Sequence, residues 1–225
     1  MIFLLSIIVL DWIIRLSYVT VLVPAGLLAA RYRNLKSAHR WFLGVLICRL
    51  LSLGVSDLLY RNNVNPNYAG SVYYIVVVIF FAGFFFNVAD LWKQRKVLLV
   101  IMALHMLFSL CNLLFIQKET LNTYSSISLS VIVITLCLIF FYRLLKNLPT
   151  ENLLTLPSFW IVTAEFIVTT GQMLMESFAH FLINIFNDNL IVLWVFHHGL
   201  GIGGNLILIY ATWLIFKSAD PGKGG

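Results

Sequence analysis

The stretch 190–217, LIVLWVFHHGLGIGGNLILIYATWLIFK, is long and apolar enough to cross a membrane as a single helix. A bilayer core of about 30 Å needs roughly 20 helical residues, each of which adds about 1.5 Å of rise. The stretch nevertheless contains His197, His198 and Asn205. Polar side chains cost free energy in hydrocarbon unless they find partners, so all three are candidate functional residues.

The composition of the whole chain is also that of a membrane protein. Of its 225 residues, 61% are hydrophobic and 11% are charged, and the mean hydropathy is +0.95. Such a chain has too few charges to cover a water-soluble surface, so we expect a polytopic, all-α membrane protein. The net charge of +6 comes from residues beside the apolar runs. It therefore predicts membrane topology and no binding to nucleic acid.

Seven apolar runs have the length of a membrane span. They predict spans at about 3–30, 41–60, 70–92, 97–116, 125–145, 158–185 and 190–216. The loops between them are short, and most are too short to hold a separate domain. We expect residues 1–217 to form one seven-helix transmembrane bundle, followed by a short polar tail at 218–225.

The lysines and arginines outside the spans predict the orientation of the bundle. Eleven of them lie on one side of the membrane and two on the other. The eleven are Arg31, Arg33, Lys36, Arg40, Lys93, Arg95, Lys96, Arg143, Lys146, Lys217 and Lys223, and the two are Arg61 and Lys118. Because positive charge is retained in the cytoplasm, we expect the N-terminus outside and the C-terminus in the cytoplasm.

Ionisable residues of the last two spans predict one polar cluster in the outer half of the membrane. At about 100° per residue, each of these spans has a polar face, and the turn NDN between them is short enough for the two faces to meet. Protonation or ligand binding there could change the helix packing. The candidate sensing residues are Glu176 and His180 on the sixth span, and His197, His198 and Asn205 on the seventh.

Four further charged residues predict intramembrane ion pairs. Asp11 and Arg15 are four residues apart on the first span, a spacing that brings side chains together on a helix. Arg49 on the second span and Glu165 on the sixth are expected at similar depths in the inner half. An unpaired buried charge is costly, so we expect these pairs to fix the packing.

Three other patterns concern packing. The aromatic run 80–86, FFAGFFF, is expected to face lipid or, alternatively, to line a pocket. Gly199 and Gly203 form a GxxxG pattern, which is typical of close contact between membrane helices. A polar face on the fourth span consists of His105, Ser109 and Asn112.

The outer cluster leaves an enzyme open as the alternative function. Glu176, His180 and His197 could bind zinc in a metal-dependent hydrolase or oxidoreductase, and histidines of two spans could ligate haem. The sequence has no HExxH or histidine-box motif, and His197 and His198 point about 100° apart. We therefore expect no metal, no other cofactor and no catalytic residue. A small transporter is the third possibility, although repeated halves are absent from the sequence.

Three motifs resemble a group of bacterial sensor proteins. They are LLAARYRNL after the first span, LPSFWIVTAEFI at the start of the sixth, and LWVFHHGLGIGGNLILIYATWL in the seventh. The group consists of seven-transmembrane modules that precede sensor histidine kinases or are encoded beside two-component genes. The resemblance covers essentially the whole chain. Its matching positions are Phe159, Trp160, Trp194, His197 and Asn205.

The resemblance implies a sensory or signal-relay module of the bacterial cytoplasmic (inner) membrane. After Lys217 the sequence contains only SADPGKGG. We therefore expect the signal to pass to a separate partner, a histidine kinase or another signalling protein, unless the chain is an excised sensor module. The other expected partners are the lipid bilayer and an unidentified small ligand.

Overall fold

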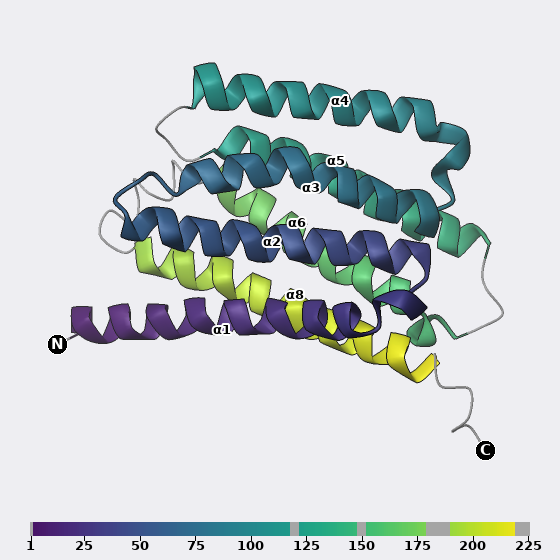
Figure 1. Cartoon of the computed structure of the whole chain (residues 1–225), viewed down its shortest axis with the longest axis horizontal. Helices are drawn as coiled ribbons and strands as arrows, with labels where there is room; N and C mark the ends of the chain where they lie inside the picture. Colours follow the sequence, from purple (N-terminus) through teal and green to yellow (C-terminus); the bar gives the residue numbers. More distant parts are fainter. Residues whose placement is uncertain (1, 118–121, 148–151, 179–189, 219–225) are drawn as a thin grey trace.

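The computed structural model is helical throughout the residues that it describes, which are 2–117, 122–147, 152–178 and 190–218 (Figure 1). The long helices are α1 (Ile2–Ala30), α2 (Ser37–Arg61), α3 (Asn67–Val88), α4 (Arg95–Cys111), α5 (Thr123–Lys146), α6 (Pro157–Ser177) and α8 (Leu190–Ser218). The shorter elements are η1 (Tyr32–Asn34), η2 (Leu91–Gln94), the π-helical turn η3 (Asn112–Ile116) and η4 (Leu153–Thr155). The expected all-α class is confirmed over these residues.

Six of the described helices are long and apolar enough to cross a membrane. Their apolar segments are Trp12–Ala30, Ser37–Arg61, Asn67–Val88, Leu91–Ile116, Thr123–Lys146 and Val195–Lys217. An α-helix pairs its backbone N–H and C=O groups internally, as the bilayer core requires. The six helices therefore indicate an integral membrane protein. Helix α6 is less apolar because it contains Glu165, Gln172 and Glu176.

Six helices pack in a closed ring, and α4 lies outside it. The order around the ring is α1, α2, α3, α5, α6 and α8, with α8 packing back against α1. Helix α4 packs against α3 and α5 and forms one edge of the bundle (Figure 1). Successive helices run in opposite directions. We name the two ends of the bundle the Asn67 end, where α3 begins, and the Arg95 end, where α4 begins.

The aromatic run of α3 belongs to the core of the bundle. Phe84 and Phe85 are fully buried, and the ring of Phe84 lies 5.3 Å from that of Phe42 on α2. Helix α3 packs against α2, α4 and α5, and residues 81–86 are all buried. The expectation that the run 80–86 faces lipid is therefore wrong.

Small residues allow α6 and α8 to approach closely. A methyl group added at Gly204 of α8 would lie 2.1 Å from the side chain of Val168, and one added at Gly171 of α6 would lie 2.5 Å from that of Leu200. These two contacts place the side of α8 that carries Leu200 and Gly204 against α6.

The GxxxG glycines of α8 have a different environment. A methyl group added at Gly199 or at Gly203 would meet no atom within 4 Å. Both residues are exposed on the outer surface of the described bundle. The close contact of α8 with α6 is made by Gly204 instead, and a role of the GxxxG pair in helix packing stays a prediction.

Candidate functional site

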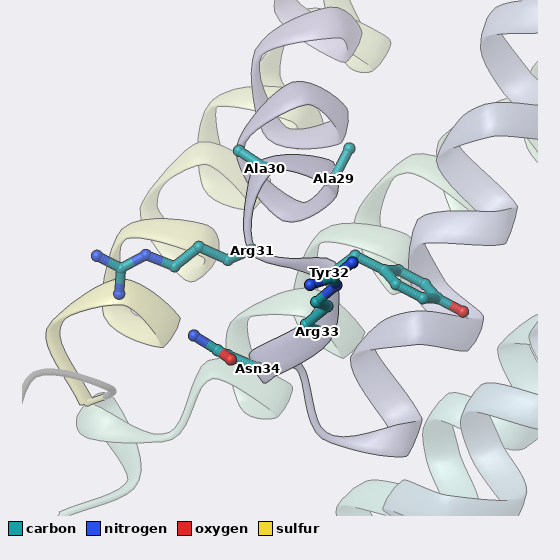
Figure 2. A pocket seen from close by; sticks show the side chains of 6 residues that line it. All are labelled: Ala29, Ala30, Arg31, Tyr32, Arg33 and Asn34. Carbon is teal, nitrogen blue, oxygen red and sulfur yellow. The ribbon is translucent and has the colours of Figure 1, made fainter.

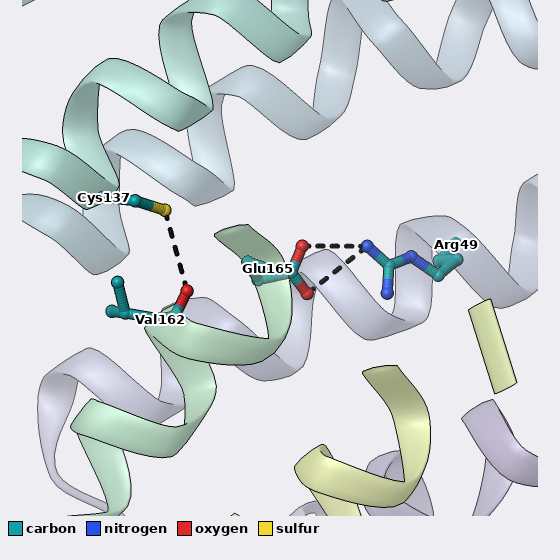
Figure 3. A network of polar contacts seen from close by, with 4 residues as sticks. All are labelled: Arg49, Cys137, Val162 and Glu165. Atoms are coloured by element: carbon teal, nitrogen blue, oxygen red, sulfur yellow. Dashed lines mark hydrogen bonds and ion pairs between the residues drawn. The ribbon is translucent and has the colours of Figure 1, made fainter. Parts of the chain in front are cut away.

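A buried ion pair joins α2 to α6 across the ring (Figure 3). Arg49 Nη2 lies 3.1 Å from Oε2 and 3.3 Å from Oε1 of Glu165. The Glu165 side chain is 2% exposed and that of Arg49 is 20% exposed. Tyr73 of α3 also contacts the guanidinium group. The two charges that the sequence pairs are therefore in contact, with a third helix beside them.

The same segment of α6 has a contact with α5. The thiol of Cys137 donates a weak hydrogen bond to the carbonyl oxygen of Val162, with Sγ at 3.8 Å from that oxygen (Figure 3). Val162 lies three residues before Glu165 on α6. Polar contacts therefore hold this segment from α5 on one side and from α2 on the other.

Glu176, near the other end of α6, faces α3 and α5. The polar groups beside its carboxylate are the hydroxyls of Ser126 and Tyr74. Its Oε2 atom is buried and has no hydrogen-bond partner among the described residues. Leaving a carboxylate oxygen buried and unpaired costs free energy. Of the predicted sensing residues whose side chains are described, Glu176 is thus the one with a buried side-chain atom that lacks a hydrogen-bond partner.

His197 and His198 lie together on α8. Their ring centroids are 5.6 Å apart and the rings are perpendicular. The polar neighbours of Glu176 include Ser126 of α5 and Tyr74 of α3. His180, another member of the predicted cluster, lies outside the described residues. The meeting of Glu176 with the imidazoles of α8 stays a prediction.

Asn205 joins α8 to α1. Its side chain is buried, and Nδ2 donates to Thr20 Oγ1 over 3.1 Å. The Thr20 hydroxyl in turn donates to the carbonyl oxygen of Ser17 over 2.9 Å. This arrangement satisfies the Asn205 amide within the bundle, away from Glu176.

The predicted pairing of Asp11 with Arg15 stays a prediction. Both residues lie on α1, where the helical spacing would bring their side chains together. The Asp11 side chain lies outside the described ones, and Arg15 is exposed on the surface of the bundle.

Sequence reasoning missed most of a buried polar network at the Asn67 end. The Asn112 side-chain amide lies 3.0 Å from both Gln117 Oε1 and Ser125 Oγ, and it also contacts Asn122. Asn122 donates onward to the Ser71 hydroxyl on α3. Only the polar face of α4 pointed to this network. Its other members are Ser71 of α3 and single residues in or beside the α4–α5 turn, which have no helical periodicity.

His105 is the second polar anchor of α4. It is buried, and its ring nitrogens lie 3.0 Å from Ser128 Oγ and 3.2 Å from the carbonyl oxygen of Tyr74. These contacts connect α4 with α5 and α3. The carbonyl belongs to the same Tyr74 whose hydroxyl group faces Glu176, so the two polar regions adjoin.

The described side chains include no set of metal ligands. No group of three or more His, Cys, Asp or Glu residues in that part of the chain lies close enough to hold an ion. Of the three ligands that the sequence suggests, His180 is not described and Glu176 is turned toward α3. The zinc site stays a hypothesis.

The polar groups inside the bundle thus lie at two levels. Glu176 and the Asn112 network lie toward the Asn67 end, and the pair formed by Arg49 and Glu165 lies near the middle of the bundle. Arg49 is twelve residues from either end of α2, whose bounds are Ser37–Arg61. Comparisons of the chain with models of protein families, with curated proteins and with solved structures found no match.

Proposed function

We propose that the chain is a membrane sensory module, in which Glu176 receives a stimulus and α6 relays it to a separate signalling partner. The observation that supports this most strongly is the buried Oε2 of Glu176, which has no hydrogen-bond partner among the described residues. Binding of a proton, or of a ligand that donates a hydrogen bond, would satisfy this oxygen. Either event would change the free energy with which α6 packs against the neighbouring helices.

Helix α6 is a seventh span in this proposal. It packs between α5 and α8, and its Glu165 side chain is almost fully buried inside the bundle. Paired in this way, a carboxylate within the membrane avoids contact with lipid. The positive charge at the Arg95 end favours a cytoplasmic location for that end, with the Asn67 end outside.

Two pairs of residues connect the two polar levels. Glu176 and Glu165 are eleven residues apart on α6, about 16 Å along the helix axis. Tyr74, beside Glu176, and Tyr73, beside Arg49, are consecutive on α3. A displacement of α6 at Glu176 would therefore act on the ion pair through two helices at once.

Helix α8 provides a route toward the Arg95 end. It packs closely on α6 through Gly204 and Val168. It then continues to Ser218, past Lys217. A shift of α6 would be transmitted along this helix to the surface where a partner can bind.

The proposed location is a bacterial cytoplasmic membrane, and the proposed partner is a histidine kinase or a similar signalling protein. Both follow from the resemblance of the three motifs, LLAARYRNL, LPSFWIVTAEFI and LWVFHHGLGIGGNLILIYATWL. A metal-dependent enzyme is the competing function. Stoichiometric zinc, iron or haem in the purified protein would favour that alternative.

The function is tested by replacing the chromosomal copy in the source organism with Glu176→Gln. The matched control is Asp57→Asn, which removes an exposed carboxylate of α2 near the Asn67 end. We expect transcript profiles to respond to a shift in external pH in the parent and in the control, and to lose this response in Glu176→Gln at an equal protein level. A response that survives deletion of the gene would rule out the sensory role.

A further inference from the structure

A cavity of about 740 Å³ lies at the Arg95 end of the bundle. The first turns of α2 and α6 line it, together with the C-terminal parts of α3, α5 and α8. Its wall combines apolar side chains, including Phe140, Phe159 and Ile215, with polar ones, including Lys36, His39 and Ser158. This cavity is remote from Glu176, which lies at the opposite end of α6.

His39, in the cavity wall, has buried ring nitrogens without hydrogen-bond partners among the described residues. The residue is 6% exposed. An imidazole with two unpaired nitrogens is costly to bury, and an apolar side chain of similar size would be more stable there. Both nitrogens are covered by neighbouring atoms, so the ring would turn toward the cavity to donate a hydrogen bond to a ligand there.

Two helix N-termini face the same cavity. Helix α2 begins at Ser37 and α6 begins at Pro157, and neither N-terminus has a side-chain hydrogen-bonding cap. The first turn of a helix presents backbone N–H groups and partial positive charge, which together favour an anion. In α6 the N–H group available from this turn is that of Ser158, because Pro157 has no N–H and the Phe159 N–H donates to the Leu156 carbonyl oxygen. Together with the first turn of α2 and the charge of Lys36, it strengthens the preference.

The two other charged residues of the wall are Asp90 and Arg143. The Arg143 guanidinium group donates to the carbonyl oxygens of Ala89 and Asp90 and to the Gln94 side chain. It thereby caps the end of α3. Asp90 is exposed, so its carboxylate is hydrated. The polar groups in the buried part of the cavity are therefore mainly hydrogen-bond donors.

Positive charge also lines the approach to the cavity. Asn34 borders both this cavity and a smaller pocket of about 410 Å³ in the turn between α1 and α2 (Figure 2). The smaller pocket is lined by Arg31 and Arg33, and Figure 2 shows the Arg31 side chain extending toward α8, where it lies over the ring of Phe216. Such a surface raises the local concentration of anions.

We infer that the cavity binds a phosphate group, held by His39, Lys36, the Ser158 N–H of α6 and the N–H groups of the first turn of α2. A phosphate offers several acceptor oxygens to a site that consists mainly of donors. The apolar wall formed by Phe140, Phe159 and Ile215 fits an organic part attached to that group. A soluble phosphate compound and the headgroup of an anionic phospholipid share this chemistry.

Binding is measured as thermal stabilisation of the purified full-length chain. One arm adds inorganic phosphate to the protein in detergent. The second arm compares nanodiscs of a neutral galactolipid with and without phosphatidylglycerol. The variants are His39→Phe and Lys36→Ala, and the matched control is Lys93→Ala, which removes an exposed charge at the same end outside the cavity.

We expect stabilisation of the parent and of Lys93→Ala, with a half-saturating concentration about tenfold higher in the two cavity variants. A response to inorganic phosphate would identify a soluble ligand, and a response to phosphatidylglycerol alone would identify a lipid headgroup. No stabilisation in either arm, or equal stabilisation of all variants, would overturn the inference. If His39→Phe does not fold, the comparison of Lys36→Ala with Lys93→Ala decides the outcome.

Discussion

Arg49 and Glu165 meet across the ring of helices, with Nη2 of the arginine 3.1 Å from Oε2 of the glutamate. Their helices, α2 and α6, are not neighbours in the ring order. The ion pair therefore fixes the distance between two helices that apolar packing alone does not place side by side.

We predict that the single changes Arg49→Ala and Glu165→Ala each destabilise the protein by about 3–5 kcal/mol, because each leaves a buried charge without its partner. The double change should recover part of this loss. Thermal unfolding and folded yield in detergent measure the effect.

The control for this prediction is the ion pair between Asp57 and Arg61. Its N–O distance is 2.9 Å, but the two side chains are 46% and 73% exposed. Breaking it should cost less than about 1 kcal/mol, because solvent screens exposed pairs. If the two losses at Arg49 and Glu165 add up in the double variant, the two charges do not depend on each other.

The second prediction concerns adjacent glycines of α8. Gly204→Ala should destabilise the protein by about 1–3 kcal/mol, because the new methyl group would overlap Val168 of α6. Gly203→Ala meets no atom within 4 Å and should be neutral or slightly stabilising, since alanine favours a helix. Equal melting temperatures for the two variants would show that α8 is rotated differently from the structure.

The third prediction concerns Asn205. Asn205→Ala and Thr20→Val should each cost about 1 kcal/mol, because both remove the same hydrogen bond between α8 and α1. The double variant should be about as stable as the less stable of the two single variants, because the second change removes no further hydrogen bond. A double-mutant cycle of thermal stabilities measures the coupling, and zero coupling energy would contradict the contact.

The helices themselves could be predicted from the sequence. The apolar run 190–216 corresponds closely to α8, Leu190–Ser218, and the run 125–145 to α5, Thr123–Lys146. This works because the thickness of the bilayer sets both the length and the hydropathy of a span. The partners Arg49 and Glu165 could also be anticipated, since a buried charge requires an opposite one nearby.

The neighbours of each helix could not be predicted. Periodicity places Glu176 on a polar face of α6, but only the structure shows that its carboxylate lies beside Tyr74 of α3 and Ser126 of α5. The ring order places α8 beside α1, so Asn205 bonds with Thr20. Residues of the α4–α5 turn, such as Asn122, belong to the polar network. Their contacts could not be predicted, because residues of a turn show no helical periodicity.

The fourth prediction is the topology. Reporter domains fused after Lys217 or inserted at 93–96 should be cytoplasmic, and reporters inserted at 62–66 should be external, because the Arg95 end carries most of the positive charge. Alkaline phosphatase and green fluorescent protein activities distinguish the two sides. A C-terminal fusion found outside would contradict both the orientation and the seventh span.

The fifth prediction tests the central claim, that Glu176 controls the position of α6. Helix α6 lies between α5 and α8, so the distance between spin labels at Lys146 and Lys217 reports its displacement. Both positions are exposed, and the native cysteines are replaced beforehand.

Double electron–electron resonance in nanodiscs gives this distance at about pH 5 and about pH 8, two values between which a carboxyl group removed from water can change its protonation. We predict that the parent changes its distance distribution between the two values. Glu176→Gln, which imitates a neutral carboxyl group, should show the low-pH distribution at both. A parent distribution that does not change, or a Glu176→Gln variant that responds as the parent does, would contradict the claim.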